Sequence, residues 1–453
     1  MTQAQDEAKS VPGSAGLPSL KRRHWFGLAA AGPAAGSALL SAAGPAAART
    51  KTQAHVVIAG SGLGGIAVAH RLQALLDGVK ITIVDAKEEH NYQPGYTLVA
   101  SGVWPVAKVR ERNAQLQPEG VQWVKEMVAG FDPEGRAVIT ASGRRIGYDF
   151  LVVATGVHLD YAQIEGMDVQ AIGREGLASV YPGPQAATAT WEAMQAFVAK
   201  GGQALMTLPA TPLKCAGAPL KMTFMLRDRL AQAGTLERSR VQFMSALGNV
   251  FGVKAVNDNV LARWQDLGIA VETTQKLTAI DIGRRLATFT SPEGEKSERP
   301  YDFVHVVPPM RAPDAVKTSA LAWQQGPFAA GGWLEVDKGT LQHRRYANVF
   351  GVGDINGTPR GKTAATVKKS APVVAGNLAA VIAGQAPPLD FDGYTSCPMI
   401  TREGSALLIE FDYEGRLTPS LPFIEPLQDS WFAWLMKVRM LKPAYMAVLK
   451  GRV

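Results

Sequence analysis

The chain has 453 residues, of which 47% are hydrophobic, and its 47 Lys and Arg against 39 Asp and Glu give a net charge of +8. This length and composition predict two or three closely associated domains with a large core, and they exclude a disordered chain or a nucleic-acid-binding sequence. The small positive excess fits an anionic lipid or an anionic substrate, but an excess of this size often serves solubility alone.

Residues 1–48 differ in composition from the rest of the chain. The basic Lys21-Arg22-Arg23 precedes an uncharged stretch rich in Ala and Gly that ends in Ala46-Ala47-Ala48. This order is typical of an export signal, and the paired arginines indicate the twin-arginine route. The sequence thus predicts cleavage near Ala48 and a location on the periplasmic side of the cytoplasmic membrane. The alternatives are an uncleaved anchor and a disordered tail.

A dinucleotide-binding pattern follows the leader. It consists of a short strand at 55–58, a glycine loop at 60–65, an apolar helix, and a second strand at 80–84 that ends at Asp85. A strand before the loop, a helix after it and an acid about twenty residues on are together much more specific than the glycines alone. We therefore expect a dinucleotide at this loop.

Each loop residue has a physical role in such a site. Gly60 permits the tight turn, Gly62 lets backbone amides approach a pyrophosphate, and Gly65 lets the helix pack on the strand. Ser61 lies between the first two glycines, and Asp85 is expected to accept a hydrogen bond from the adenosine ribose.

Two later segments indicate which dinucleotide binds. The segments 151–156 and 349–354 resemble further elements of the flavoproteins with two dinucleotide-binding domains. The resemblance implies FAD as the cofactor, with Asp354 near its ribityl and pyrophosphate portion. A helix starting at 361–365 would then direct its N-terminal amides at the pyrimidine edge of the flavin. The residues expected to bind FAD in these segments are Thr155, Gly156, Gly353, Asp354, Lys362 and Thr363.

The middle of the chain, 161–305, predicts a second doubly wound domain, with a helix at 191–200 and strands at 204–208 and 241–245. An enzyme that uses NADH would need a glycine loop after the first of these strands. Prolines and a Lys-Cys pair stand there instead, so we infer that NAD(P)H is not the electron donor.

Both cysteines of the chain lie in unusual segments, at Cys215 and Cys397, next to proline and small residues. Such neighbours favour accessible, sharply turned sulfurs over a structural disulfide, which is the alternative in an exported protein. Lys214 would lower the pKa of a Cys215 thiolate if its side chain turned inward. Two thiols beside a flavin indicate sulfur redox chemistry.

With these segments the chain resembles the sulfide:quinone oxidoreductase family, in particular the type II group that includes the mitochondrial enzyme. The similar segments are 60–65, 90–99, 211–221, 351–364 and 393–398. The resemblance implies oxidation of sulfide to sulfane sulfur through a Cys215–Cys397 redox pair over FAD, with Cys215 on the flavin side. It also implies transfer of the electrons to a membrane quinone and of the sulfur to an acceptor whose identity the sequence leaves open.

Other candidate residues carry weaker patterns. His305, near the end of an expected strand, would suit proton transfer, but a lone histidine in a strand is more often packed in the core. The seven histidines show no metal-ligand spacing with the cysteines, so no metal is expected.

The C-terminal stretch from 431 reads as two short helices broken by Pro443. One face is expected to carry apolar residues and the other positive charge, which suits a helix lying in a membrane interface and is too short to span a bilayer. An amphipathic helix packed on the core of the enzyme itself is the alternative. The apolar face would consist of Trp431, Trp434, Leu435, Val438 and Leu441, and the charge would come from Lys437, Arg439, Lys442, Lys450 and Arg452.

The predicted fold class is α/β, with two doubly wound Rossmann-like domains, the FAD domain being discontinuous, and C-terminal amphipathic helices. The expected division is a signal at 1–48, FAD-binding parts at 52–160 and 306–390, a second Rossmann-like domain at 161–305, and a C-terminal region at 391–453. Three other functions remain open: the flavin subunit of a flavocytochrome-type sulfide dehydrogenase, a non-catalytic flavin- or sulfur-binding protein, and, less favoured, a type II NADH:quinone reductase.

Overall fold

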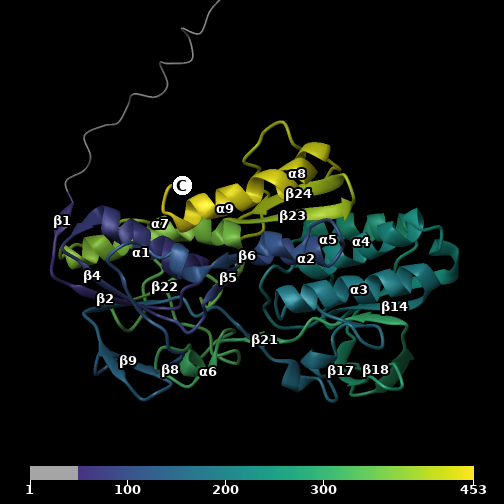
Figure 1. Ribbon diagram of the computed structural model, residues 1–453, viewed down its shortest axis with the longest axis horizontal. Helices are drawn as coiled ribbons and strands as arrows, with labels where there is room; N and C mark the ends of the chain where they lie inside the picture. Colours follow the sequence, from purple (N-terminus) through teal and green to yellow (C-terminus); the bar gives the residue numbers. More distant parts are fainter. Residues whose placement is uncertain (1–48) are drawn as a thin grey trace, which may run out of the picture. The chain divides into compact units, whose positions relative to one another are not determined.

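The computed structural model describes residues 49–453 (Figure 1). The predicted export signal at 1–48 lies outside the described residues.

The first half of the fold is built on a five-stranded parallel sheet in the order β22-β11-β2-β4-β7. One face packs against α1 (Leu63–Leu75) and α7 (Ala364–Ile382), and the other against the antiparallel strands β8, β9 and β10. The parallel strands are β2 (His55–Ala59), β4 (Lys80–Val84), β7 (Gln122–Val124), β11 (Phe150–Val153) and β22 (Val349–Gly351); β8, β9 and β10 span Val128–Asp132, Ala137–Thr140 and Arg145–Gly147.

A second five-stranded parallel sheet has the order β13-β20-β14-β15-β16. Helices α3, α4 and α5 cover one face, and the antiparallel strands β17, β18 and β19 lie near the other. The parallel strands are β13 (Leu177–Ala178), β14 (Gly202–Leu208), β15 (Ser239–Ser245), β16 (Ala270–Glu272) and β20 (Phe303–His305). The helices are α3 (Pro184–Lys200), α4 (Ala218–Gln232) and α5 (Lys254–Asp266), and β17, β18 and β19 span Lys276–Asp281, Leu286–Thr290 and Lys296–Pro300.

The predicted α/β class is confirmed, because both sheets are parallel and have other elements on both faces. In the first sheet, β2, β4 and β11 are the near-continuous apolar runs that burial on both faces requires. Strand β22 returns to pair with β11 after the whole second sheet has been formed, so the first sheet is discontinuous in sequence. The domain boundaries drawn from the sequence stay a prediction. Shorter elements are β1 (Thr50–Lys51), β3 (Leu76–Asp77), β5 (Glu89–Asn91), α2 (Tyr96–Val99), β6 (Arg110–Arg112), β12 (His158–Leu159), β21 (Met310–Arg311) and α6 (Asp314–Lys317).

The C-terminal region begins with the hairpin β23 (Thr395–Arg402) and β24 (Ser405–Phe411), on which α8 (Trp431–Leu435) packs. A π-helical turn at Met436–Met440 joins α8 to α9 (Leu441–Leu449), and α9 lies against α1 (Figure 1). The prediction of a break at Pro443 was wrong. Pro443 lies inside α9, and the departure from α-helical geometry is instead at the π-helical turn that precedes it.

The predicted faces of these helices were also wrong in part. Trp434 is 9% exposed and belongs to the core, whereas Trp431 is 65% exposed. Lys437, expected at the surface, is 2% exposed. The π-helical turn shifts the spacing of side chains from that of an α-helix, so the 3.6-residue period used for the prediction does not hold across it. Within residues 49–453, no helix has both the length and the apolar composition to cross a membrane.

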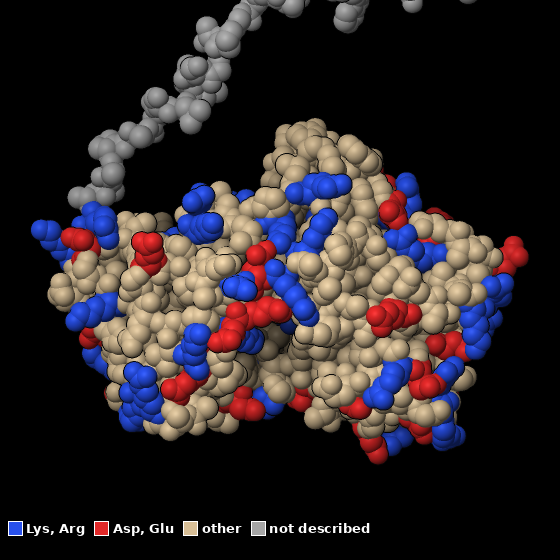
Figure 2. Space-filling view, viewed as in Figure 1, with Lys and Arg blue, Asp and Glu red and all other residues tan. Residues whose placement is uncertain are grey.

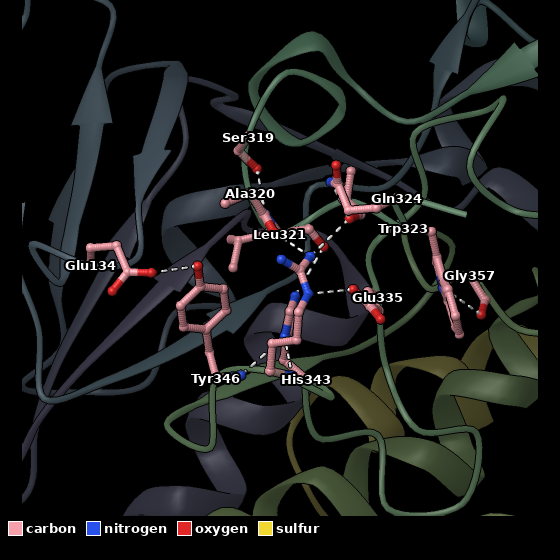
Figure 3. A network of polar contacts seen from close by, with 12 residues as sticks. Glu134, Ser319, Ala320, Leu321, Trp323, Gln324, Glu335, His343, Tyr346 and Gly357 are labelled. Atoms are coloured by element: carbon pink, nitrogen blue, oxygen red, sulfur yellow. Dashed lines mark hydrogen bonds and ion pairs between the residues drawn. The ribbon is translucent and has the colours of Figure 1, made fainter. Parts of the chain in front are cut away.

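A polar network around His343 holds the segment that precedes β22 (Figure 3). The backbone N–H groups of Arg345 and Tyr346 donate to His343 Nδ1 at 3.1 and 3.2 Å. His343 Nε2 lies 3.0 Å from the carbonyl of Leu321, which can only accept. Nδ1 is therefore the unprotonated ring nitrogen, and Nε2 carries the proton. Burial lowers the pKa of His343 to about 4, so the folded protein holds the neutral ring.

This arrangement predicts a loss of stability in mild acid. The unfolded chain binds a proton at His343 with a pKa near 6.5 and the folded chain only near 4, so the contribution of the neutral ring is fully present above pH 6.5. It declines as the pH falls toward 4, by about 1.4 kcal/mol for each pH unit. Urea unfolding at pH 7.5 and pH 5.0 measures it. His343→Asn should be less stable at pH 7.5 and should approach the wild type at pH 5.0; an equal deficit at both pH values would contradict this account.

Candidate functional site

The glycine loop at 60–65 has the close backbone contacts that its sequence predicted. Gly60 has φ +118°, and a Cβ on it would lie 2.3 Å from the carbonyl oxygen of Ala154. A Cβ on Gly65 would lie 2.0 Å from the oxygen of Gly60. Gly62 is exposed, with no atom within 4 Å of the position of a Cβ, so the space above it is open to a ligand.

Asp85 holds this loop in shape. Its Oδ2 accepts the backbone N–H of Ser61 at 2.7 Å, and its Oδ1 accepts that of Lys87 at 2.9 Å. Asn113, which the sequence analysis missed, donates from Nδ2 to the Ser61 hydroxyl and to the carbonyl of Lys87. Asn113 is 1% exposed and lies far from the loop in sequence, in a turn whose local pattern carries no signal.

The other predicted cofactor residues meet the loop at one edge of the first sheet. Thr155 and Gly156 follow β11, and Gly353 and Asp354 follow β22, so both pairs lie at the carboxyl ends of parallel strands beside β2. The Thr155 hydroxyl is buried and has no hydrogen-bond partner among the described residues, and there is free space around Gly156. An unsatisfied hydroxyl next to open space fits a bound dinucleotide.

Lys362 and Thr363 precede α7. Thr363 is the N-cap, and its hydroxyl accepts the N–H of Thr366 at 3.2 Å. Lys362 is buried, and its Nζ donates to the carbonyls of Asp354 and Asn356 at 2.6 and 2.9 Å. Burial lowers the pKa of Lys362 to about 7, against the effect of Asp354. These hydrogen bonds of Lys362 stabilise the loop that follows β22.

The two cysteines, far apart in sequence, lie side by side. A Cβ on Gly217 would lie 2.2 Å from Cys397 Sγ, so this sulfur rests directly on the loop that carries Cys215. Both are free thiols. The backbone N–H of Cys215 donates to the carbonyl of Lys362 at 2.8 Å, which joins this loop to the start of α7.

The two sulfurs differ in setting. Cys215 is half-buried at φ +51°, a left-handed conformation that is costly for a residue with a side chain and is often found at functional sites. It therefore has the sharp turn that its neighbours predicted. Cys397 is 4% exposed and lies on β23, so the expectation of an accessible, turned sulfur was wrong for it. Here Pro398 stands within a hairpin strand.

The charges around the pair favour a thiolate at Cys215. The hydrogen bond with the Cys397 thiol lowers the pKa of Cys215 well below its ordinary range, although burial opposes it. Lys221, with Nζ 3.4 Å from Cys215 Sγ, lowers it further, as does Lys437. The same hydrogen bond, together with burial, raises the pKa of Cys397.

The lysines differ from those expected. Lys214 is not among the main causes that lower the pKa of Cys215; burial lowers its own pKa to about 8, against the effect of Asp354. Lys221 and Lys437, each 2% exposed, surround the cysteines instead. Lys221 was visible in sequence as a charge six residues after Cys215, since the turn at 215–217 leads directly into α4. Lys437 carried no such signal.

His305 is fully buried on β20, and neither ring nitrogen has a hydrogen-bond partner among the described residues. Burial lowers its pKa to about 3. These facts favour a packed core residue over proton transfer.

Removal of the Lys221 charge should slow thiol chemistry at Cys215. In Lys221→Met the thiolate loses its nearest cation, so alkylation of Cys215 by iodoacetamide at pH 7 should slow roughly tenfold, and its pH profile should move to higher pH. Mass spectrometry of the Cys215 peptide measures the rate. Lys214→Met is the matched control and should change the rate less. An equal effect of both variants would show that Lys221 is not the controlling charge.

Residues 54–194 match the family model described as pyridine nucleotide-disulphide oxidoreductase. The mitochondrial sulfide:quinone oxidoreductase of Mus musculus is 34% identical over 397 residues, which cover 87% of this chain and 86% of that protein. The Dictyostelium discoideum protein of the same name is 35% identical and covers 89% and 88%.

The fold has a matching solved structure. The sulfide:quinone oxidoreductase of Aquifex aeolicus aligns with a TM-score of 0.73 and 22% identity over 88% of this chain and 92% of that one. At this identity the likeness concerns the fold, and the family follows from the sequence relatives. The chain is therefore an FAD-binding oxidoreductase that belongs to the sulfide:quinone oxidoreductase family.

Proposed function

We propose that this enzyme oxidises sulfide to sulfane sulfur through Cys215 and Cys397 and passes the electrons by way of FAD to a membrane quinone. The observation that carries the proposal is the pair of adjacent thiols with a buried ammonium 3.4 Å from one of them. Sulfide oxidation needs a sulfur that can be attacked and a thiol that can leave as an anion. The site offers both.

In the proposed reaction the cysteines begin as a disulfide. Hydrosulfide attacks the Cys397 sulfur, the bond between the two cysteines breaks, and a new sulfur–sulfur bond leaves a persulfide on Cys397. Cys215 departs as a thiolate, which Lys221 stabilises. Transfer of the outer sulfur to an acceptor frees the Cys397 thiol, and re-formation of the disulfide releases two electrons and the thiol proton. Overall, sulfide loses two electrons and the quinone takes them up with two protons.

FAD supplies a two-electron acceptor that a quinone can reoxidise. The residues proposed to bind it lie at the carboxyl edge of the first sheet, where open space borders the unsatisfied Thr155 hydroxyl. The Cys215 loop meets the same region through its hydrogen bond to Lys362. This contact supports the assignment of Cys215 to the flavin side. The proposed FAD-binding set is Gly60, Ser61, Gly62, Gly65, Asp85, Thr155, Gly156, Gly353, Asp354, Lys362 and Thr363.

Membrane contact is proposed for the C-terminal region. Its exposed apolar side chains include Phe423 (71%), Trp431 (65%), Met440 (49%) and Phe432 (36%), and the rings of Phe423 and Phe432 lie in edge contact. Figure 2 shows few charged side chains over the lobe that contains α8 and β24. An apolar, aromatic surface of this kind suits the interface of a bilayer that holds the quinone.

A location on the periplasmic side is proposed from the composition of residues 1–48 alone. The sequence relatives named above are mitochondrial proteins, and their names give this proposal no support.

Anaerobic titration with sulfide tests the proposed chemistry. Sulfide should bleach the flavin spectrum, and a short-chain ubiquinone should restore it. In Cys397→Ser and Cys215→Ser bleaching by sulfide should slow on the order of a thousandfold or more, since a hydroxyl cannot form the sulfur–sulfur bond. Dithionite should still reduce both variants, which shows that their flavin is intact.

Each other outcome has a distinct meaning. Rapid bleaching by sulfide in Cys397→Ser would refute the cysteine mechanism. Bleaching that quinone does not reverse would favour a cytochrome acceptor. Bleaching by NADH would favour assignment of the protein as a type II NADH:quinone reductase. No bleaching by sulfide would exclude sulfide as the electron donor.

Vesicle binding tests the membrane surface. Replacing both Trp431 and Phe432 with Ser should weaken cosedimentation with phosphatidylglycerol-containing vesicles roughly tenfold or more, because two large apolar side chains no longer enter the interface. Met127→Ser, at a residue 54% exposed outside the C-terminal region, is the control and should bind as the wild type does. Unchanged binding by the double variant would contradict the proposal.

Protease added to intact spheroplasts should digest the bound enzyme if it faces the periplasm.

A further inference from the structure

His90 occupies a junction that neither the cysteine chemistry nor the proposed FAD-binding set explains. It lies on β5 and is 4% exposed. Its Nε2 is 2.7 Å from the hydroxyl of Tyr445 on α9. Strand β5 pairs with β6, and the residue after β6 is Asn113, which donates to the Ser61 hydroxyl in the glycine loop. The strand pair β5–β6 thus joins the loop that faces the dinucleotide to the C-terminal helices, with the buried His90 ring at the contact with α9.

The contact between His90 and Tyr445 is a single buried hydrogen bond. It joins the Nε2 of a ring that is 4% exposed to a hydroxyl whose residue is 8% exposed. Burial lowers the pKa of His90 to about 4, which keeps the ring neutral and preserves one donor and one acceptor. Loss of either partner leaves a buried polar atom without a hydrogen bond, which is unfavourable.

Other contacts connect the same parts of the fold. Arg71 on α1, the helix that follows the glycine loop, is 8% exposed and donates to the carbonyl of Val448 at 3.3 Å and to that of Val453. Lys437 Nζ donates to the carbonyl of Pro94 at 2.7 Å, within the segment that starts at His90. The C-terminal segment 431–453 therefore contacts both the surroundings of the glycine loop and the helix behind it.

We infer that His90 is a positioning residue through which FAD binding and docking of α8 and α9 stabilise each other. FAD needs the glycine loop in one shape, and Asn113 ties that shape to the strand pair that carries His90. His90 in turn places its Nε2 against the Tyr445 hydroxyl. Because such coupling is reciprocal, the factor by which FAD strengthens docking of the helices equals the factor by which docked helices strengthen FAD binding.

Two measurements test the coupling, and neither depends on sulfide turnover. Dissociation of FAD from the holoenzyme is followed by the fluorescence of the released flavin. Trypsin cleavage at the exposed Arg439 and Lys450 is followed in holoenzyme and in flavin-stripped protein. Tyr445→Phe should release FAD roughly five- to tenfold faster than the wild type, the effect of one buried hydrogen bond. FAD should slow trypsin cleavage in the wild type, and this protection should fall by a similar factor in Tyr445→Phe.

Tyr161→Phe is the matched control, since it removes an equally buried hydrogen bond, to Ser179 at 2.6 Å, beside the second sheet. It should leave the FAD dissociation rate and the protection unchanged. Equal dissociation rates in the two variants would overturn the inference. So would trypsin cleavage of the wild type that is the same with and without FAD, a result that stands even if Tyr445→Phe does not fold.

Discussion

The contact between Cys397 Sγ and the backbone of Gly217 is the constraint on which the catalytic centre depends. It brings the hairpin β23–β24 against the loop between β14 and α4, and that loop is tied to the start of α7 through the bond from Cys215 to Lys362. The second sheet, the C-terminal hairpin and the cofactor edge of the first sheet therefore meet at one point. Only a residue without a side chain permits this approach.

Burial of several ammonium groups near this point sets the electrostatics of the site. Lys221 and Lys437 are almost fully buried, and a buried cation is costly unless an anion or hydrogen bonds compensate it. The carbonyl of Pro94 does so for Lys437, and the Cys215 sulfur does so for Lys221. The neighbouring sulfurs raise the pKa of Lys221 while its charge lowers that of Cys215, so the two shifts describe one ion pair. The fold thus favours the charged form of a thiol over its neutral form.

Much of this could be predicted from sequence because the signals are local. The strand, glycine loop, helix and acid of 55–85 lie within one unit whose geometry requires those residue types, and the strands β14 and β15 formed where apolar runs indicated them. The remainder depends on contacts between distant segments. Lys437 was assigned to a surface because a charge on an amphipathic helix is usually solvated, and Asn113 and His90 act through partners that no spacing identifies. The setting of Cys397 was misjudged because proline usually marks a turn, whereas here it lies within a hairpin strand.

The π-helical turn at 436–440 gives the C-terminal helices a dependence on length as well as on residue type. Such a turn holds one residue more than an α-helix would, and each residue of an α-helix advances the side chains by about 100°. Deleting one residue in this turn would therefore restore an ordinary α-helical turn and leave α9 facing as it does now, whereas inserting a further residue would rotate α9 by about that angle relative to α8. Trp434 and Tyr445 could then no longer both face inward. Related chains that keep these contacts should therefore tolerate substitutions here, or the loss of one residue, more readily than a further insertion.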